Sequence, residues 1–89
     1  MELKDYRKEI DAIDEELVRL FQERMDVAEK IAAYKKEKNL PIFQPAREQE
    51  KLIQIQEMSR PEMVPYLQKV YALLFELSRS YQASREEIL

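Results

Sequence analysis

The sequence predicts an all-α protein with three helices per chain: a long N-terminal helix, a short one and one of medium length. The 89 residues include no glycine, and only four prolines interrupt the helical pattern. Between the prolines, apolar residues recur three and four positions apart, which is the period of an amphipathic helix. The content of 45% hydrophobic and 37% charged residues is typical of a folded chain, and we expect a single domain over residues 1–89.

The first helix is expected from about Leu3 to about Lys38. Its apolar positions form a heptad seam, which is typical of a helix that packs along another helix. The seam consists of Leu3, Tyr6, Ile10, Ile13, Leu17, Leu20, Val27, Ile31 and Tyr34. The helix should end at the segment Asn39–Pro41, because a residue that precedes proline is driven out of helical geometry.

Two further helices are expected after an extended loop over residues 41–45. The second should begin near Pro45, since proline suits the first position of a helix, and should be broken by Ser59–Pro61. The third should run from about Glu62 or Pro65 to about Ser84. Its broad face carries Leu67, Val70, Tyr71, Leu74, Leu77, Ser78 and Tyr81.

The first helix is too long to be covered within its own chain. Some 36 residues make a helix of about 54 Å, and the two shorter helices cannot bury a seam of that length. The simplest partner for the seam is a second copy in a closed two-fold dimer. We therefore predict an intertwined homodimeric helical bundle.

The residue types that are absent exclude several classes of function. Without His or Cys there is no catalytic triad, thiol nucleophile or typical zinc or haem site, and without Gly there is no phosphate-binding loop. The net charge of −3 argues against a nucleic-acid surface. No apolar run is long enough for a membrane span and no leader pattern is visible, so we expect a cytoplasmic protein.

Arg24 and Lys35 are the first candidate site residues. Arg24 occupies a heptad core position between Leu17 and Ile31. It is either a register-setting residue whose charged head reaches water, or a guanidinium that awaits an anionic ligand. Lys35 follows eleven residues later, so the two side chains share a face about 16 Å apart and can hold a small dianion between them.

Arg7 lies on the same helix but far from Lys35. The 28 residues between them correspond to about 42 Å, so no small ligand can touch both within one chain. In an antiparallel pair of such helices, Arg7 of one copy can approach the Arg24–Lys35 region of the other. The alternative is a surface arginine that pairs with Asp11.

The later helices carry further candidates. Ser78 and Gln82 are four residues apart on the third helix, either as boundary residues or as neutral donors that project into a pocket. Arg47 and Glu48 fall in the first turn of the second helix. A carboxylate there gains from the helix dipole, so capping is the alternative role for Glu48.

Five segments of the chain, taken in order and with their spacings, form a specific pattern. They are Tyr6-Arg-Lys-Glu-Ile-Asp-Ala-Ile-Asp14, Glu23-Arg24, Lys35-Lys-Glu-Lys-Asn-Leu-Pro41, Arg47-Glu48, and Ser78 with Gln82. In this pattern the chain resembles the helical class of chorismate mutases over nearly its whole length. The first segment is similar to that family's L-R-x-x-I-D-x-I-D opening.

The resemblance implies a cofactor-free homodimer that rearranges chorismate to prephenate. By the same resemblance, Arg24 and the partner's Arg7 would form salt bridges with the two carboxylates of the substrate. Lys35 and Gln82 would donate to its ether oxygen, Lys35 would also assist a carboxylate, and Ser78 would contact a carboxylate.

The resemblance also implies a subsite for the ring hydroxyl of the substrate. Glu48 would hold this hydroxyl, with Arg47 beside it. Gln44, a further expected binding residue, stands where the family usually has Asp, so the resemblance does not itself imply the side-chain contact with the hydroxyl, whereas a backbone N–H there could still serve.

Two alternative functions stay open at this point. One is an isochorismate pyruvate-lyase, which resembles this family in fold and also needs no cofactor. The other is a non-catalytic helical dimer that regulates another enzyme of the pathway. A free-standing enzyme and a domain of a fused polypeptide are both compatible with the sequence.

Overall fold

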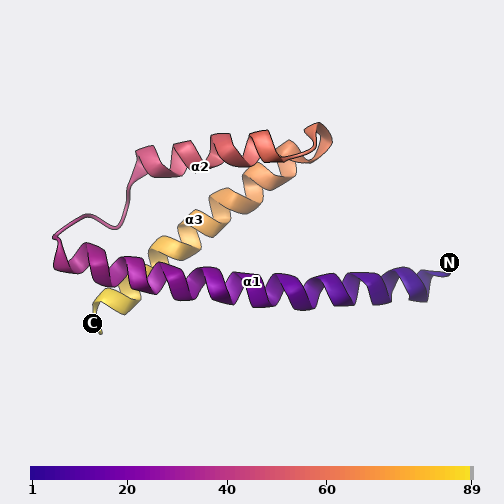
Figure 1. Ribbon diagram of the computed structural model, residues 1–89, viewed down its shortest axis with the longest axis horizontal. Coiled ribbons are helices and arrows are strands. Elements are labelled where there is room, and N and C mark those ends of the chain that lie inside the picture. Colours follow the sequence, from indigo (N-terminus) through magenta and orange to yellow (C-terminus); the bar gives the residue numbers. More distant parts are fainter. Residues whose placement is uncertain (89) are drawn as a thin grey trace.

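The structure, a computed structural model, describes residues 1–88 and is all-helical over that range (Figure 1). Helix α1 spans Leu3–Glu37, α2 spans Pro45–Met58, a 3₁₀ turn η1 spans Pro61–Met63 and α3 spans Val64–Glu86. The predicted three-helix, all-α chain is confirmed. The α1 and α2 boundaries match the prediction within a residue, and α3 begins between its two expected starting points.

The C-terminal end of α1 is closed by a Schellman motif, in which two backbone N–H groups beyond the helix bond back to its last turn. The N–H of Leu40 donates to the Lys35 carbonyl at 2.8 Å, and that of Asn39 to the Lys36 carbonyl at 3.3 Å. Asn39 has a φ of 56°, in the left-handed region that asparagine tolerates better than most residues. The motif starts the loop that leads to α2.

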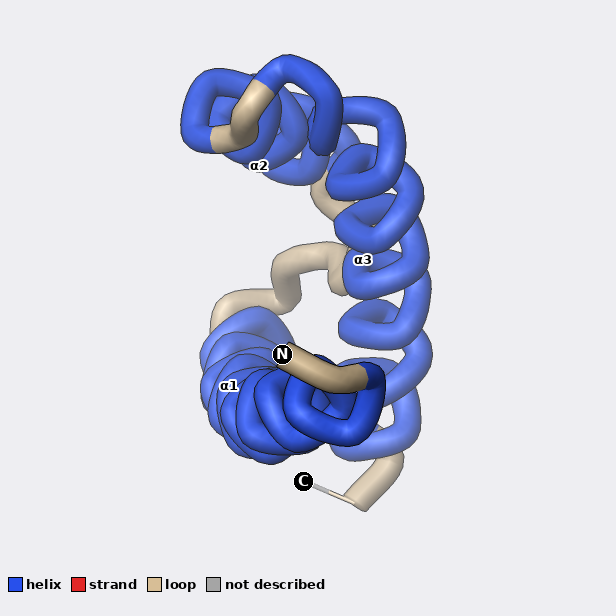
Figure 2. The backbone as a smooth tube through the Cα atoms, turned by 90° about the vertical axis from the view of Figure 1, so that its right-hand side faces the viewer, coloured by secondary structure: helices blue, strands red, loops and turns tan. Residues whose placement is uncertain are grey.

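Helix α3 packs against both other helices and holds them apart. In Figure 1 it runs diagonally from the end of α2 to the C-terminal half of α1, and Figure 2 shows α1 and α2 at opposite ends of it. The molecule is elongated, with extents of 54 × 28 × 15 Å.

The core of the single chain is small. Among the described residues the buried apolar side chains are Ala28, Ala32, Ile55 and Phe75. The two alanines lie one turn apart on α1, and their small side chains allow α3 to approach the α1 backbone closely. A folded chain of this length normally buries a larger share of its apolar surface.

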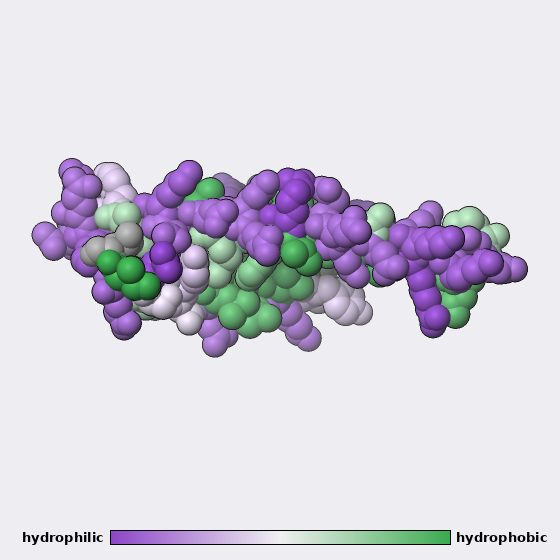
Figure 3. All heavy atoms as spheres, turned by 90° about the horizontal axis from the view of Figure 1, so that it is seen from below, coloured by the Kyte–Doolittle hydropathy of each residue, from purple (hydrophilic) through white to green (hydrophobic). Residues whose placement is uncertain are grey.

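The apolar seam of α1 is exposed. All nine predicted seam residues have between 43% and 63% of their surface accessible. Seen from the α1 side, apolar side chains gather near the middle of the molecule beside a band of hydrophilic ones, and more appear at the N-terminal end (Figure 3). The prediction that one chain cannot cover this helix is confirmed. Within residues 1–88, no helix combines the length and apolar character that a membrane span requires.

Candidate active site

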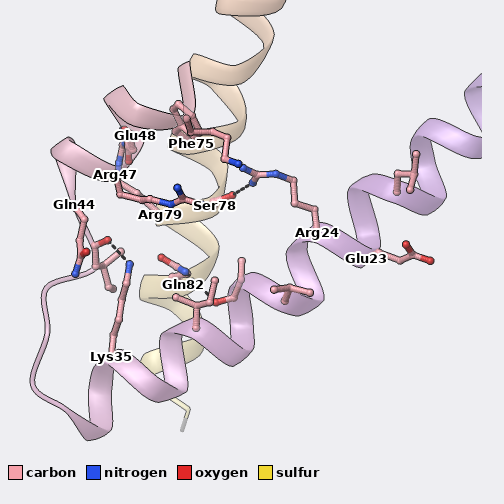
Figure 4. Close-up of a pocket in the computed structure, with 16 residues that line it drawn as sticks. Glu23, Arg24, Lys35, Gln44, Arg47, Glu48, Phe75, Ser78, Arg79 and Gln82 are labelled. Atoms are coloured by element: carbon pink, nitrogen blue, oxygen red, sulfur yellow. Dashed lines mark hydrogen bonds and ion pairs between the residues drawn. The ribbon is translucent and has the colours of Figure 1, made fainter. Parts of the chain in front are cut away.

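A cavity of about 710 Å³ opens between the C-terminal half of α1, the loop to α2, the first turns of α2 and the C-terminal half of α3. Its walls include seven of the eight predicted site residues (Figure 4). These are Arg24, Lys35, Gln44, Arg47, Glu48, Ser78 and Gln82. Six apolar residues also line it, namely Leu20, Val27, Ala28, Ile31, Ile42 and Phe75, together with the charged residues Glu23, Lys51 and Arg79.

Arg24 reaches across the cavity from α1 to α3. Its Nη1 donates to the Ser78 hydroxyl at 2.9 Å, and its guanidinium carbon lies 5.9 Å from the centre of the Tyr71 ring. The side chain is half-buried and points into the cavity rather than along the helix surface (Figure 4). This orientation favours a guanidinium that binds an anionic ligand over a residue whose head reaches water.

Lys35 points into the same cavity from one end of it (Figure 4). Its Nζ donates to the carbonyl of Ile42, in the loop, at 2.8 Å. Burial lowers the pKa of Lys35 from its ordinary value, while the carboxylates of Glu86 and Glu48 act in the opposite direction. An ammonium group has three donors, so the bond to Ile42 leaves two for a ligand.

Gln82 is the one buried polar side chain among the described residues, with 6% of its surface exposed. Its amide nitrogen donates to the Ala28 carbonyl on α1 at 3.0 Å. An amide nitrogen carries two N–H groups, so this bond fixes the side chain and leaves one donor for the cavity. Ser78 lies one turn earlier on the same face of α3, as the sequence spacing predicts.

The first turn of α2 supplies the opposite wall. Gln44 is the residue that precedes α2, and its side-chain nitrogen donates to the Pro41 carbonyl at 3.3 Å. Arg47 is exposed, and its Nη1 lies 3.7 Å from a carboxylate oxygen of Glu50. Glu48 is half-buried and faces α3.

Arg7 is the predicted site residue that the single chain does not bring to the cavity. It is exposed near the N-terminal end of α1, 17 residues before Arg24 and hence about 26 Å from it along the axis. The ion pairs of the described residues do not include Arg7 with Asp11, so the alternative of a local surface pair is not formed.

Sequence reasoning missed two cations of the cavity, Arg79 and Lys51. Arg79 lies three residues before Gln82 and four after Phe75, so it shares their face of α3. Lys51 follows Glu48 by three residues on α2, which places both on one face. Helical spacing from the predicted residues is the signal that could have found both.

The cavity is rich in positive charge within an acidic chain. Five cations line it (Arg24, Lys35, Arg47, Lys51 and Arg79) against two carboxylates (Glu23 and Glu48), whereas the whole chain has a net charge of −3. With neutral donors among them, these residues can bind a small organic anion, fix its conformation and stabilise negative charge that develops on it. The lining offers no imidazole or thiol for nucleophilic catalysis.

Comparison with known proteins gives one family match and two curated relatives. The family model described as chorismate mutase type II matches residues 6–83. A bifunctional chorismate mutase/prephenate dehydratase of Aquifex aeolicus (strain VF5) is 55% identical over 49 residues, which are 55% of this chain and 14% of that protein. The T-protein of Haemophilus influenzae is 44% identical over 46 residues, 52% of this chain and 12% of that protein.

The matched segment therefore spans less than a fifth of the length of either relative. No solved structure matches the chain.

Proposed function

This chain belongs to the chorismate mutase type II family, and from that membership we propose that it rearranges chorismate to prephenate in aromatic amino-acid biosynthesis. The observation that carries the proposal is the cavity, which gathers cations and neutral donors around an apolar wall. That combination suits a substrate with two carboxylates, an ether oxygen and a ring hydroxyl.

The proposed reaction does not depend on the His and Cys side chains that the chain lacks. It breaks a carbon–oxygen bond and forms a carbon–carbon bond within one molecule, without proton transfer or a covalent enzyme intermediate. The enzyme has to hold the flexible ether side chain folded over the ring, which is an orientation effect. It also has to stabilise negative charge that develops on the ether oxygen.

We assign the hydrogen bonds to the ether oxygen of the substrate to Lys35 and Gln82. Each already donates one hydrogen bond to a backbone carbonyl of the protein, which fixes its direction before substrate binds. The donors that remain are thus preorganised for the transition state, and loss of one such donor typically costs roughly 3–4 kcal/mol of stabilisation.

We assign one substrate carboxylate to Arg24, with Ser78 beside it, because the two side chains meet in the cavity at 2.9 Å. The ring hydroxyl is assigned to Glu48 at the start of α2, with Arg47 next to it. The Gln44 side chain donates one N–H to the Pro41 carbonyl, so its second N–H, its amide oxygen and the backbone N–H remain for the hydroxyl subsite.

We further propose that the active unit is an intertwined homodimer, in which the partner's Arg7 binds the second substrate carboxylate. Two facts support this. The α1 seam is 43–63% exposed in one chain, and Arg7 lies about 26 Å from Arg24 on the uncovered part of that helix. The absence of cysteine suits the cytoplasm, which we propose as the compartment.

The direct test is to add the purified protein to chorismate and follow the loss of chorismate absorbance, with prephenate identified as the product. Isochorismate is assayed in parallel. Consumption of isochorismate alone, with release of pyruvate, would replace the mutase by the lyase. A stable dimer inactive on both substrates would point to the non-catalytic regulatory role.

A further inference from the structure

Arg79 lines the cavity, but the proposed mechanism assigns it no role. It lies on α3 between Ser78 and Gln82, and its Nη1 donates to the two carboxylate oxygens of Glu48 at 2.6 and 2.5 Å (Figure 4). The pair joins α3 to the first turn of α2, 31 residues apart in the sequence. Its two side chains are 34% and 24% exposed.

The same guanidinium also contacts the loop that leads to α2. Its carbon lies 4.8 Å from the centre of the Phe43 ring, within the range of a cation–π contact. Ile42, the preceding residue, accepts the hydrogen bond from Lys35. The loop is thus attached to α1 by Lys35 and to α3 by Arg79.

No other described cation of the cavity lies within hydrogen-bonding distance of Glu48. Arg47 turns toward Glu50, at 3.7 Å, and Lys51 donates to Gln54 at 2.9 Å. A planar guanidinium can stack on a ring with its face while its edge donates to a carboxylate, which the point charge of a lysine cannot do.

We propose that Arg79 is a positioning residue, which holds the Glu48 carboxylate and the Phe43 loop so that Glu48 can accept a hydrogen bond from the ring hydroxyl of chorismate. The inference rests on the proposed mutase function. The ring hydroxyl takes no part in the bonds that break and form, so Glu48 contacts it in the ground state and in the transition state alike. Loss of Arg79 should therefore raise KM with little change in kcat.

The test compares steady-state kinetics of wild type, Arg79→Gln, Arg79→Lys, Glu48→Gln and the double variant. Arg79→Gln should raise KM roughly tenfold and change kcat less than about threefold. Arg79→Lys should recover part of this loss, because it restores the charge but not the stacked geometry. In the Glu48→Gln background, Arg79→Gln should change KM less than about twofold, since the group that it positions is already altered.

Arg85→Gln is the matched control. Arg85 is a half-buried α3 arginine outside the cavity, which pairs with Glu29 of α1 at 3.1 Å. Its loss removes a comparable ion pair but should leave KM close to that of wild type.

Two results would overturn the inference: an equal rise of KM on Arg79→Gln in both Glu48 backgrounds, or an unchanged KM. In either case, conversion of chorismate by the wild-type protein would still support the proposed function. Wild-type protein that does not convert chorismate would overturn the proposed function, and this inference with it.

Discussion

At the scale of single residues, two donors of the cavity are already partly used by the fold itself. Lys35 donates to the Ile42 carbonyl at 2.8 Å and Gln82 to the Ala28 carbonyl at 3.0 Å. Each bond fixes the direction of its group and leaves at least one N–H free for a ligand. A donor held in this way needs no rearrangement when negative charge develops on the substrate.

The alkaline side of the pH–rate profile should report Lys35. Burial lowers its pKa from the ordinary value of 10.5, against the opposing effect of Glu86 and Glu48. Because only the protonated form donates, kcat/KM, which reports the free enzyme, should fall as the pH rises through this lowered pKa. The parameter kcat should persist to higher pH, since a bound dianion favours the charged lysine.

Both profiles can be measured from about pH 6 to pH 11. Alkaline limbs at the same pH in kcat and kcat/KM would contradict a lysine that faces the anionic substrate.

Gln82→Glu should be active only in acid, because an ionised carboxylate cannot donate to the ether oxygen. The protonated carboxyl has a single O–H, for which the Ala28 carbonyl competes. We therefore expect an acid-shifted optimum with a peak roughly tenfold or more below wild type. Gln56→Glu, on an exposed position of α2, should leave the profile unchanged. A Gln82→Glu profile parallel to that of wild type would show that Gln82 does not face the ether.

At the scale of the elements, the ends of the helices place the site. The Schellman motif stops α1 two residues after Lys35 and turns the chain into the loop whose Ile42 carbonyl that lysine contacts. Pro45 then begins α2 at a point that puts Glu48 in its first turn. Helix α3 crosses from α2 to α1 and adds Ser78 and Gln82 on one face.

Asn39 is the residue on which this turn depends. Its φ of 56° costs a β-branched residue about 1–2 kcal/mol, whereas glycine adopts it freely. Asn39→Val should lower the free energy of unfolding by about 1–2 kcal/mol, and Asn39→Gly should leave it within about 0.5 kcal/mol of wild type. Urea unfolding at one fixed protein concentration measures both. Equal stability of the valine and glycine variants would show that the left-handed conformation at residue 39 does not affect the stability of the fold.

The sequence was sufficient to place these elements because its prolines and its apolar period act locally. Pro41, Pro45 and Pro61 mark the breaks, and the spacing from Arg24 to Lys35 follows from helix geometry alone. In this way, and with the help of the family pattern, seven residues that line the cavity were predicted.

The contact of Arg79 with Glu48 could not be predicted by the same route. It depends on the angle at which α3 crosses α2, which long-range packing sets and which no local pattern encodes. In the proposed dimer the place of Arg7 depends on a second chain, so it does not follow from the fold of one chain.

At the scale of the whole molecule, one chain leaves much of its apolar surface exposed. Among the described residues it buries few apolar side chains, it leaves the seam of α1 exposed along a 54 Å molecule, and no residue before Leu20 lines its cavity. A two-fold partner that packs along α1 would bury the seam and bring Arg7 to the cavity at the same time. Assembly and catalysis would then require the same contact.

The most direct test of this shared site is complementation between two inactive variants. Arg7→Ala and Lys35→Ala are prepared separately, and each should lose activity by orders of magnitude while it keeps its helical fold. They are then unfolded, mixed in equal amounts and refolded. In a mixed dimer the cavity with an intact Lys35 also receives an intact Arg7 from the partner, and the other cavity carries both lesions.

Random assortment makes about half of the dimers mixed, each with one complete site of two, so activity should recover to roughly a quarter of wild type. The control mixture of Arg24→Ala with Lys35→Ala should recover nothing, because both residues line the cavity of a single chain and every site keeps one lesion. No recovery in the Arg7→Ala and Lys35→Ala mixture, with mixed dimers shown to have formed, would contradict a site completed by the partner's Arg7.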